Sequence, residues 1–260
     1  MSRSKPIIVA NWKMNPSSRR EVLRLSRLVA GNALKHRETE VVLAPPFTYL
    51  DIVGRTKGAF ALAAQDAFWE PKGAYTGEIS PSMLKDLGVR YVILGHSERR
   101  KYFGESDDVV NSKVKAVLAS RLIPIIAIGE ETMESQEAVP PVIFQQLSSA
   151  IRGIPKRRMT GAIIAYEPVW AISATPGAKP DTPDNATSRA IYIRRLLTKI
   201  LGRRVADTVR IIYGGSVSSK NASSFLSRDI RGMEGLLVGG ASLDAEEFVK
   251  IVAAVARKGN

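Results

Sequence analysis

Four polar side chains, each next to a short and continuously apolar stretch, could carry acid–base chemistry: Asn11, Lys13, His96 and Glu167. A carboxylate can remove a proton, and an imidazole can polarise a carbonyl and relay protons. An ammonium group and an amide can stabilise the negative charge that develops during such a step. If the fold brings these four groups to one place, the sequence predicts proton transfer on a small substrate.

Each of these residues also has a purely structural interpretation. A charged group at the end of a buried run is costly unless it is paired, so Lys13 needs an anion, which is either Glu98 or a substrate. Glu167 could equally form an internal salt bridge. His96 is one of two histidines, and a lone histidine is more often structural than catalytic. A helical turn beginning at Ser97 would favour the neutral imidazole.

Two glycine turns in the last fifth of the chain indicate a phosphate site. Ser216 follows Gly214 and Gly215, and a second pair is formed by Gly239 and Gly240. Glycine lets the backbone approach an anion closely, and backbone N–H groups at such turns bind phosphate. The two turns therefore favour a phosphorylated ligand over turn geometry alone.

A long polar segment follows Glu167 before any helical pattern resumes. Its polar part begins after Trp170 and carries three prolines and a glycine. A structural protein has little use for such a segment beside a strand-end carboxylate. We interpret it as a mobile cover over a positioned base.

The elements that must position these residues recur along the chain as short, β-branched apolar runs with helical patterns between them. Most runs are continuously apolar, as expected for strands buried on both faces of a parallel sheet. Eight such runs in 260 residues predict a single (β/α)8 barrel domain over residues 1–260, whose functional groups meet at the carboxyl ends of the strands. The alternative is an open doubly wound sheet, but neither a G-x-G-x-x-G nor a G-x-x-x-x-G-K-[ST] motif occurs. The predicted strands are Pro6–Ala10, Glu40–Ala44, Ala59–Ala64, Arg90–Leu94, Leu122–Ile128, Gly161–Tyr166, Val209–Tyr213 and Gly235–Val238.

Three helix starts can be predicted from local patterns. Ser18 and Glu21 form a capping box before the first helix. Thr182 stands before a proline and predicts the start of another helix, and Ser242 is predicted to open the last one. The apolar stripe of the first helix is predicted to comprise Val22, Leu25, Leu28 and Val29.

The chain is strongly basic and has no cysteine, with a net charge of +13. Its basic pairs are scattered and lack interleaved aromatics, so we expect at most nonspecific contact with nucleic acid, although the charge would attract phosphorylated substrates. Without cysteine and with two histidines, neither a cysteine-ligated zinc site nor a histidine-rich metal site is expected. No apolar run approaches the ~20 residues of a membrane span. The first residues do not resemble a signal peptide, so we expect a cytoplasmic protein with no membrane partner.

Six segments, in chain order, resemble the triosephosphate isomerase family, and the resemblance runs from residue 5 to about residue 255. Chance assembly of all six is not credible. The resemblance implies interconversion of dihydroxyacetone phosphate and D-glyceraldehyde 3-phosphate through an enediol(ate), in glycolysis and gluconeogenesis, with no cofactor or metal. The segments are NWKMN (Asn11–Asn15), GAYTGEIS (Gly73–Ser80), GHSERR (Gly95–Arg100), YEPVWAI (Tyr166–Ile172), YGGSV (Tyr213–Val217) and LVGGAS (Leu237–Ser242).

The resemblance also implies a role for each catalytic residue. Glu167 would remove the proton beside the carbonyl and return it to the neighbouring carbon. Neutral His96 would polarise the carbonyl and move protons between the two oxygens. Lys13 and Asn11 would stabilise the developing negative charge, and Glu98 would orient these groups.

The same resemblance implies how substrate is held and covered. The segment after Glu167 would close as a lid, with Pro168–Trp170 as its first hinge and with Tyr213 and Ser216 as its catch. Closure is needed because an enediolate left in water loses phosphate. The phosphate would bind backbone N–H groups of Ser173, Ser216, Gly239 and Gly240.

The lid departs from the family pattern. Ala171–Pro180 is several residues longer than the usual tip, and Ser173 stands where a glycine is expected. A left-handed conformation would cost serine more than glycine, so the phosphate grip and the closure of the lid are open to test. Ala127 stands where the family commonly has a cysteine, and we expect only a packing change.

The Gly73–Ser80 segment resembles the loop that family members insert into a neighbouring subunit beside Asn11 and Lys13. The resemblance implies a homodimer with Tyr75 at the tip of this loop and Gln65 near the interface. A tetramer is a second possibility.

The sequence leaves two other functions open. A barrel with the same phosphate turns could be an epimerase or lyase for another sugar phosphate, although such enzymes are not expected to combine all four catalytic groups. A basic binding protein without activity is supported by the charge alone, and steeply salt-dependent binding would favour it.

Overall fold

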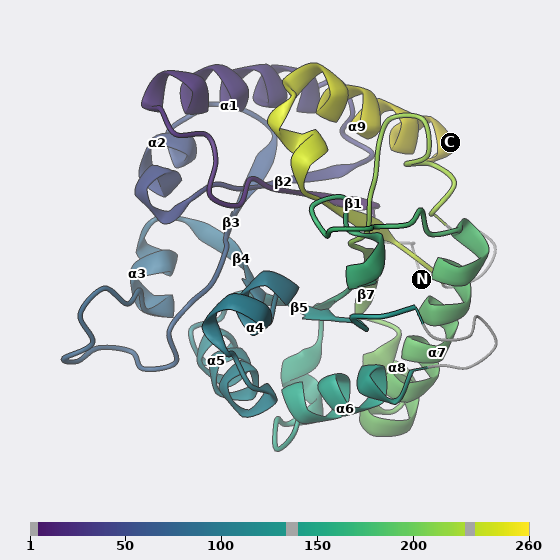
Figure 1. The fold of residues 1–260 in the computed structure, drawn as a ribbon. Helices are drawn as coiled ribbons and strands as arrows, with labels where there is room; N and C mark the ends of the chain where they lie inside the picture. Colours follow the sequence, from purple (N-terminus) through teal and green to yellow (C-terminus); the bar gives the residue numbers. More distant parts are fainter. Residues whose placement is uncertain (1–4, 134–139, 227–231, 260) are drawn as a thin grey trace.

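Eight parallel strands close into a barrel in the computed structural model, which describes residues 5–133, 140–226 and 232–259 (Figure 1). Each strand pairs with its neighbours in chain order, and β8 pairs with β1 to complete the ring. This confirms the predicted (β/α)8 barrel, and every predicted strand boundary lies within two residues of the observed one. The strands are β1 (Ile7–Asn11), β2 (Glu40–Ala44), β3 (Phe60–Ala64), β4 (Val89–Leu94), β5 (Ile123–Ile128), β6 (Ile163–Tyr166), β7 (Arg210–Tyr213) and β8 (Gly235–Val238).

The strands are apolar throughout because successive side chains enter two different cores. In β1, Ile7 and Val9 lie in the cluster inside the barrel, whereas Ile8 and Ala10 lie in the cluster between strands and helices. Both faces of each strand are thereby covered, which removes the alternation with polar residues. Ala127 belongs to the inner cluster and is buried, as expected for a residue that only packs.

Helices between the strands form the outer layer (Figure 1). None of them, over the part of the chain that is described, is both long and apolar enough to cross a bilayer. The helices are α1 (Arg19–Ala33), α2 (Leu50–Gly54), α3 (Pro81–Asp86), α4 (Ser97–Phe103), α5 (Asp107–Ala119), α6 (Pro141–Ala150), α7 (Pro183–Leu201), α8 (Arg203–Ala206) and α9 (Ala245–Gly259). The short 3-10 helices are η1 (Phe47–Tyr49), η2 (Lys156–Met159), η3 (Val169–Ala171) and η4 (Gly240–Leu243).

Two of the predicted helix starts are confirmed. The Ser18 hydroxyl accepts the N–H of Glu21 at 3.3 Å at the start of α1. The Thr182 hydroxyl accepts the N–H of Asn185 at 3.2 Å at the start of α7. Each cap satisfies a backbone donor that has no partner within its own helix.

Two other helix predictions are wrong. Ser242 does not open the last helix: it lies in η4, where its hydroxyl donates to the Gly239 carbonyl, and Asp244 caps α9 instead. Leu28 does not belong to the apolar stripe of α1, because it is 42% exposed. At about 100° per residue, Leu28 falls about 60° outside the sector that contains Val22 and Leu25.

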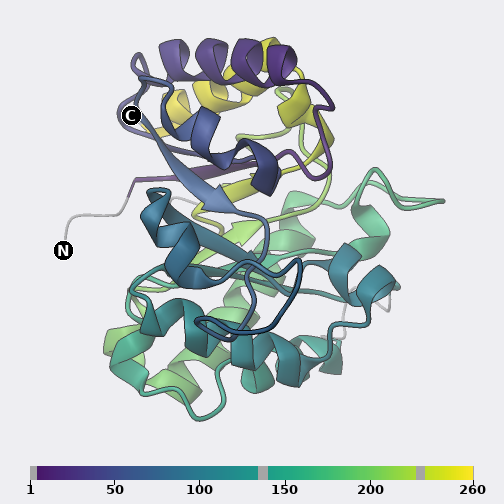
Figure 2. The ribbon, with the colours of Figure 1, turned by 90° about the vertical axis from the view of Figure 1, so that its left-hand side faces the viewer.

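Two segments extend beyond the barrel. The segment that follows β6 projects past the carboxyl ends of the strands (Figure 2). The Gly73–Ser80 loop projects sideways next to α3 (Figure 1). The first of these borders the candidate active site, and the second is the loop predicted to meet another subunit.

Candidate active site

The predicted catalytic and phosphate-binding residues all line one cavity at the carboxyl ends of the strands. Its volume is about 300 Å³. The ends of β1 and β6 and the loops after β4, β7 and β8 contribute to its wall. The predicted residues that line it are Asn11, Lys13, His96, Glu167, Ser173, Ser216, Gly239 and Gly240.

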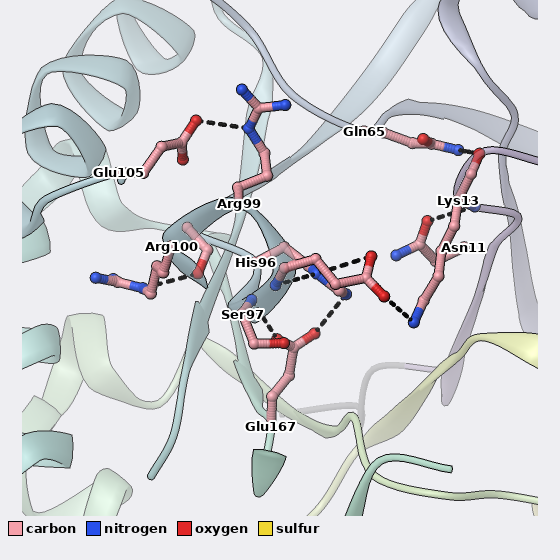
Figure 3. Close-up of polar contacts among 11 residues, drawn as sticks. Asn11, Lys13, Gln65, His96, Ser97, Arg99, Arg100, Glu105 and Glu167 are labelled. Atoms are coloured by element: carbon pink, nitrogen blue, oxygen red, sulfur yellow. Dashed lines mark hydrogen bonds and ion pairs between the residues drawn. The ribbon is translucent and has the colours of Figure 1, made fainter. Parts of the chain in front are cut away.

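Glu167 is fixed at the end of β6 with only 2% of its surface exposed. Its Oε1 lies 3.2 Å from His96 Nε2, and its Oε2 accepts the N–H of Ser97 at 3.2 Å (Figure 3). Two glycines leave room for it: a Cβ on Gly214 would lie 2.7 Å from Glu167 Cγ, and one on Gly129 would lie 2.0 Å from its carbonyl oxygen. The place of the carboxylate therefore depends on the absence of two side chains.

His96 caps the start of α4, and this contact identifies its protonated nitrogen. Nδ1 accepts the N–H of Glu98 at 3.2 Å, so in the neutral ring the proton is on Nε2. Nε2 is the nitrogen that faces Glu167 (Figure 3). The ring can thus offer a hydrogen-bond donor to an oxygen bound in the cavity.

Lys13 has a left-handed backbone, with φ of 52°, which is rare outside glycine. Asn11 Oδ1 accepts its N–H at 3.1 Å, and Gln65 Nε2 donates to its carbonyl at 2.8 Å. Its Nζ lies 2.6 Å from Glu98 Oε1. Of the two anions expected as partners for Lys13, Glu98 pairs with it in the structure. The backbone N–H of Glu98 also donates to His96 Nδ1.

The loops after β7 and β8 form a corner of exposed backbone. Both the hydroxyl and the N–H of Ser242 donate to the Gly239 carbonyl, at 2.7 and 2.8 Å, which fixes this turn. A Cβ on Gly240 would meet no atom within 4 Å, and one on Gly239 would lie 3.4 Å from Lys13 Cε. The corner is open to a ligand and lies beside an ammonium group, which suits an anion.

Ser173 lies at the exposed base of the lid tip and does not have the strain that its type suggested. It is absent from the described non-glycine residues with positive φ, and Gly177 makes the left-handed turn of the longer tip, with φ of 71°. The N–H of Ser216 donates to the Ala171 carbonyl at 3.1 Å. One of the predicted phosphate-binding donors is therefore bonded to the lid.

The first end of the lid is tied to Glu130, a buried carboxylate after β5. Its Oε1 accepts Trp170 Nε1 at 3.1 Å and the Tyr166 hydroxyl at 2.7 Å, while its carbonyl accepts the N–H of Val169 at 2.9 Å. The Lys179 N–H then donates to the Trp170 carbonyl at 3.0 Å. These bonds close the tip into a loop whose two ends lie together.

The second end of the lid places a carboxylate against Tyr213. Asp181 Oδ1 accepts the N–H of Thr182 and Asn185 Nδ2, each at 2.7 Å. Asp181 Oδ2 and the Tyr213 hydroxyl are both buried, and the interaction between the two side chains acts to lower the pKa of Asp181. Burial raises the pKa of Asp181 despite the hydrogen bonds from Asn185 and Thr182, and the charge of Glu130 adds to this rise. Burial, followed by the charge of Asp181, raises the pKa of the Tyr213 phenol.

A buried ion network holds the helix that carries Ser97 and Glu98. Arg99 Nε lies 2.5 Å from Glu105 Oε1 (Figure 3) and 3.0 Å from Asp66 Oδ2, and Lys113 pairs with both carboxylates. Burial raises the pKa of Asp66 although Lys113 is adjacent. Burial also acts to raise the pKa of Glu105, but hydrogen bonds from Lys113 and Arg99 outweigh it and lower that pKa.

Sequence reasoning did not assign a role to three of these contacts. Glu130 was given no role from the sequence, although its position after β5 resembles that of Glu167 after β6 and could have indicated a function. The Ser97 N–H that holds Glu167 and the Gln65 bond to Lys13 depend on chain geometry and have no sequence pattern. Among the described residues, no group of three or more histidines, aspartates or glutamates is arranged to hold a metal ion.

Comparison with known proteins finds the family that the sequence motifs resemble, and the match covers nearly the whole chain. The family model described as triosephosphate isomerase matches residues 6–255. A protein named triosephosphate isomerase from Caldanaerobacter subterraneus subsp. tengcongensis is 45% identical over 251 residues, covering 95% of this chain and 98% of the relative. Proteins of the same name from Alkaliphilus oremlandii and Dictyoglomus turgidum are 46% and 42% identical, with the same coverage of both chains.

Proposed function

The chain belongs to the triosephosphate isomerase family and interconverts dihydroxyacetone phosphate and D-glyceraldehyde 3-phosphate, a step of glycolysis, and we propose that Asn11, Lys13, His96 and Glu167 carry out this reaction. The observation that supports the assignment is the 3.2 Å approach of Glu167 Oε1 to His96 Nε2 in the wall of one cavity. This places a base and a hydrogen-bond donor within reach of adjacent substrate atoms.

Glu167 is the base in this proposal. Its carboxylate takes the proton from the carbon next to the carbonyl, and the electron pair of that C–H bond forms the double bond of an enediol(ate). The resulting carboxylic acid then returns the proton to the neighbouring carbon. The Ser97 N–H bond to Oε2 and the space at Gly214 keep the carboxylate at the end of β6.

His96, Lys13 and Asn11 stabilise the negative charge that develops on the substrate oxygens. The Nε2–H of His96 donates to the carbonyl oxygen and exchanges protons between the two oxygens as the double bond moves. The ammonium of Lys13 provides the positive charge, and Asn11 both contributes its amide and accepts the N–H of Lys13. Glu98 is a positioning residue, since it contacts the amine of Lys13 and Nδ1 of His96.

Phosphate binding and lid closure are coupled through Ser216 in this proposal. The N–H groups of Ser173, Ser216, Gly239 and Gly240 bind the phosphate. Because the Ser216 N–H donates to the Ala171 carbonyl, it can bind phosphate only if that contact opens, so the phosphate competes with the lid for one donor. The lid then moves on the segment anchored at Trp170 and covers the enediolate, which loses phosphate in water.

The assembly and the location of the protein complete the proposal. We place residues 1–260 in one domain of a cytoplasmic homodimer that uses no metal or cofactor. Exposed apolar side chains support the dimer: Tyr75 in the Gly73–Ser80 loop is 45% exposed, Tyr102 and Phe103 in α4 are 67% and 68% exposed, and Met14 after β1 is 91% exposed. A single species of one chain mass in sedimentation would contradict it.

Replacement of Glu167 by Gln tests the catalytic assignment. The amide cannot accept the proton, so kcat should fall by about a thousandfold, within the range of lost general-base catalysis. The dissociation constant for glycerol 3-phosphate, a reduced analogue of the substrates, should change by less than about twofold because the phosphate corner is untouched.

Glu131→Gln is the matched control, since this exposed carboxylate lies after the adjacent strand. Its kcat should equal that of the unmodified protein. If Glu167→Gln instead weakened analogue binding as much as it lowered kcat, Glu167 would be a binding residue and the proposal would fail.

A further inference from the structure

The barrel has a second opening, at the amino-terminal ends of its strands and therefore at the opposite end from the lid. The cavity there has a volume of about 800 Å³, against about 300 Å³ for the catalytic cavity. Residues at or just before the starts of seven strands line it, from Lys5 before β1 to Arg210 at the start of β7. The isomerase reaction uses none of these residues.

The wall of this amino-terminal cavity carries more positive charge than its single carboxylate can neutralise. Lys5, Arg37, Arg90 and Arg210 line it together with one acidic residue, Glu40. Glu40 is already engaged: Arg210 Nη1 lies 2.7 Å from its Oε2, and Arg90 lies 3.4 Å from its Oε1. Since Arg210 and Arg90 share one carboxylate, the cavity retains an excess of cations.

Two of the cations at the rim have no acidic partner among the described residues. The amine of Lys5 donates to the Arg37 backbone carbonyl at 2.6 Å, which draws the two residues together. Arg37 itself is exposed. The amine of Lys5 therefore lies beside the backbone of Arg37, and both residues line the cavity.

A buried polar atom in the cavity wall also lacks a partner. Thr39 is 5% exposed and lines the cavity, and its Oγ1 makes no hydrogen bond among the described residues. A buried hydroxyl without a partner costs free energy. An anion bound at this wall would accept a hydrogen bond from it after a small outward rotation of the side chain.

We propose that the amino-terminal cavity is a binding site for a polyphosphate chain, either inorganic or carried by a nucleoside. Guanidinium groups bind phosphate oxygens through paired hydrogen bonds, and three cations around one opening match several phosphate groups better than one. The volume of this cavity, about 800 Å³, is larger than a single phosphate group requires. A part of the positive charge of the chain then has a local use beyond general solvation.

Titration calorimetry with inorganic tripolyphosphate tests the site directly. The full chain is used at low ionic strength with EDTA, and saturating glycerol 3-phosphate occupies the catalytic cavity. One tripolyphosphate should bind per chain. The double variant Arg37→Ala/Arg90→Ala should weaken this binding by at least about tenfold, because two charge-assisted contacts are lost.

The double variant Arg20→Ala/Arg24→Ala is the matched control, since it removes the same charge from exposed positions of α1 outside the cavity. Its affinity should stay within about threefold of the unmodified value, as expected for a change in long-range attraction alone. Tripolyphosphate should also raise the melting temperature of the control and not that of the Arg37/Arg90 variant. Both variants should keep the unmodified kcat.

Comparison of ATP with tripolyphosphate, both without magnesium, distinguishes the two sources. Equal affinities support recognition of the phosphate chain alone, and tighter binding of ATP supports a nucleoside polyphosphate. Absence of binding of either compound, or equal weakening in the two double variants, would overturn the proposal.

Discussion

The two ends of the barrel use polar residues in opposite ways. At the amino-terminal end, the Tyr91 hydroxyl donates to Glu40 at 2.5 Å and the Arg210 guanidinium contacts both residues, at 2.7 and 3.3 Å. At the carboxyl end, Lys13 has a positive φ, and the buried Glu130 Oε2 and Trp12 Nε1 have no hydrogen-bond partner among the described residues.

The difference separates what stabilises the fold from what performs the reaction. Within the amino-terminal end, Glu40, Tyr91 and Arg210 satisfy one another, unlike Thr39 and the cations at the opening. The pKa of Glu40 reflects this: burial acts to raise it, but hydrogen bonds from Tyr91 and Arg210 outweigh burial and lower it. The groups above the barrel retain strain and unused hydrogen-bonding capacity, which is typical of sites that must respond to a ligand. Changes at the two ends should therefore affect different measurements.

Glu40→Gln should have the largest effect on stability of the changes compared here. It leaves the mostly buried guanidinium of Arg210 without its charged partner, so the free energy of unfolding in urea should fall by about 2–4 kcal/mol. The kcat should be unchanged. Asp51→Asn, which breaks the exposed pair with Arg55, is the control and should leave the free energy of unfolding nearly unchanged, because solvent screens the pair. If Glu40→Gln also lowered kcat, the two ends of the barrel would not have separate roles in stability and activity.

Gly214→Ala should lower kcat more than it lowers stability. The new methyl group would approach Glu167 Cγ to 2.7 Å and displace the base, so kcat should fall by about 10–100-fold while KM changes little. Gly31→Ala in α1 is the control, since its Cβ would meet no atom within 4 Å, and it should stabilise the protein slightly. Full activity in Gly214→Ala would show that the space beside Glu167 does not set the position of the carboxylate.

Asp181→Asn should have the smallest effect of the three changes, a shift in melting temperature whose size depends on pH. Burial raises the pKa of Asp181 in the folded protein, so the folded state holds this proton more tightly than the unfolded chain. The resulting stabilisation is present below the ordinary aspartate pKa and is lost as the pH rises through the folded value. The melting temperature of Asp181→Asn should exceed that of the unmodified protein near neutral pH, and this advantage should disappear in acid. Asp184→Asn, at an exposed position, should show no such advantage, and a constant difference for Asp181→Asn would contradict the burial argument.

The fold and the positions of the candidate catalytic residues could be predicted from the sequence because both depend on local patterns. Continuous apolar runs identified the strands, and the residue that follows each run had to lie at the barrel mouth. Asn11, Lys13, His96 and Glu167 are such residues or lie within two positions of a strand end. Their meeting in one cavity follows from strand order alone.

The rest depends on contacts between segments far apart in the chain. Glu130 meets Trp170 across 40 positions, and Ser97 meets Glu167 across 70, and no local pattern encodes either distance. Ser242 was predicted to cap α9 because serine is a favourable N-cap residue. In the structure it lies in the short η4 helix, where its hydroxyl donates to the Gly239 carbonyl. The strain anticipated at Ser173 did not occur because the longer tip moved its left-handed turn to Gly177.

The central claim of this account is that the base at the end of β6 acts under a lid that excludes water. The most direct test is to follow glyceraldehyde 3-phosphate, dihydroxyacetone phosphate and methylglyoxal in the same samples of purified protein. Methylglyoxal forms when an enediolate loses phosphate, so it reports intermediates that escape protection. We expect fast isomerisation with little methylglyoxal. Slow isomerisation with abundant methylglyoxal would contradict the closed lid, and no isomerisation would contradict the assigned site.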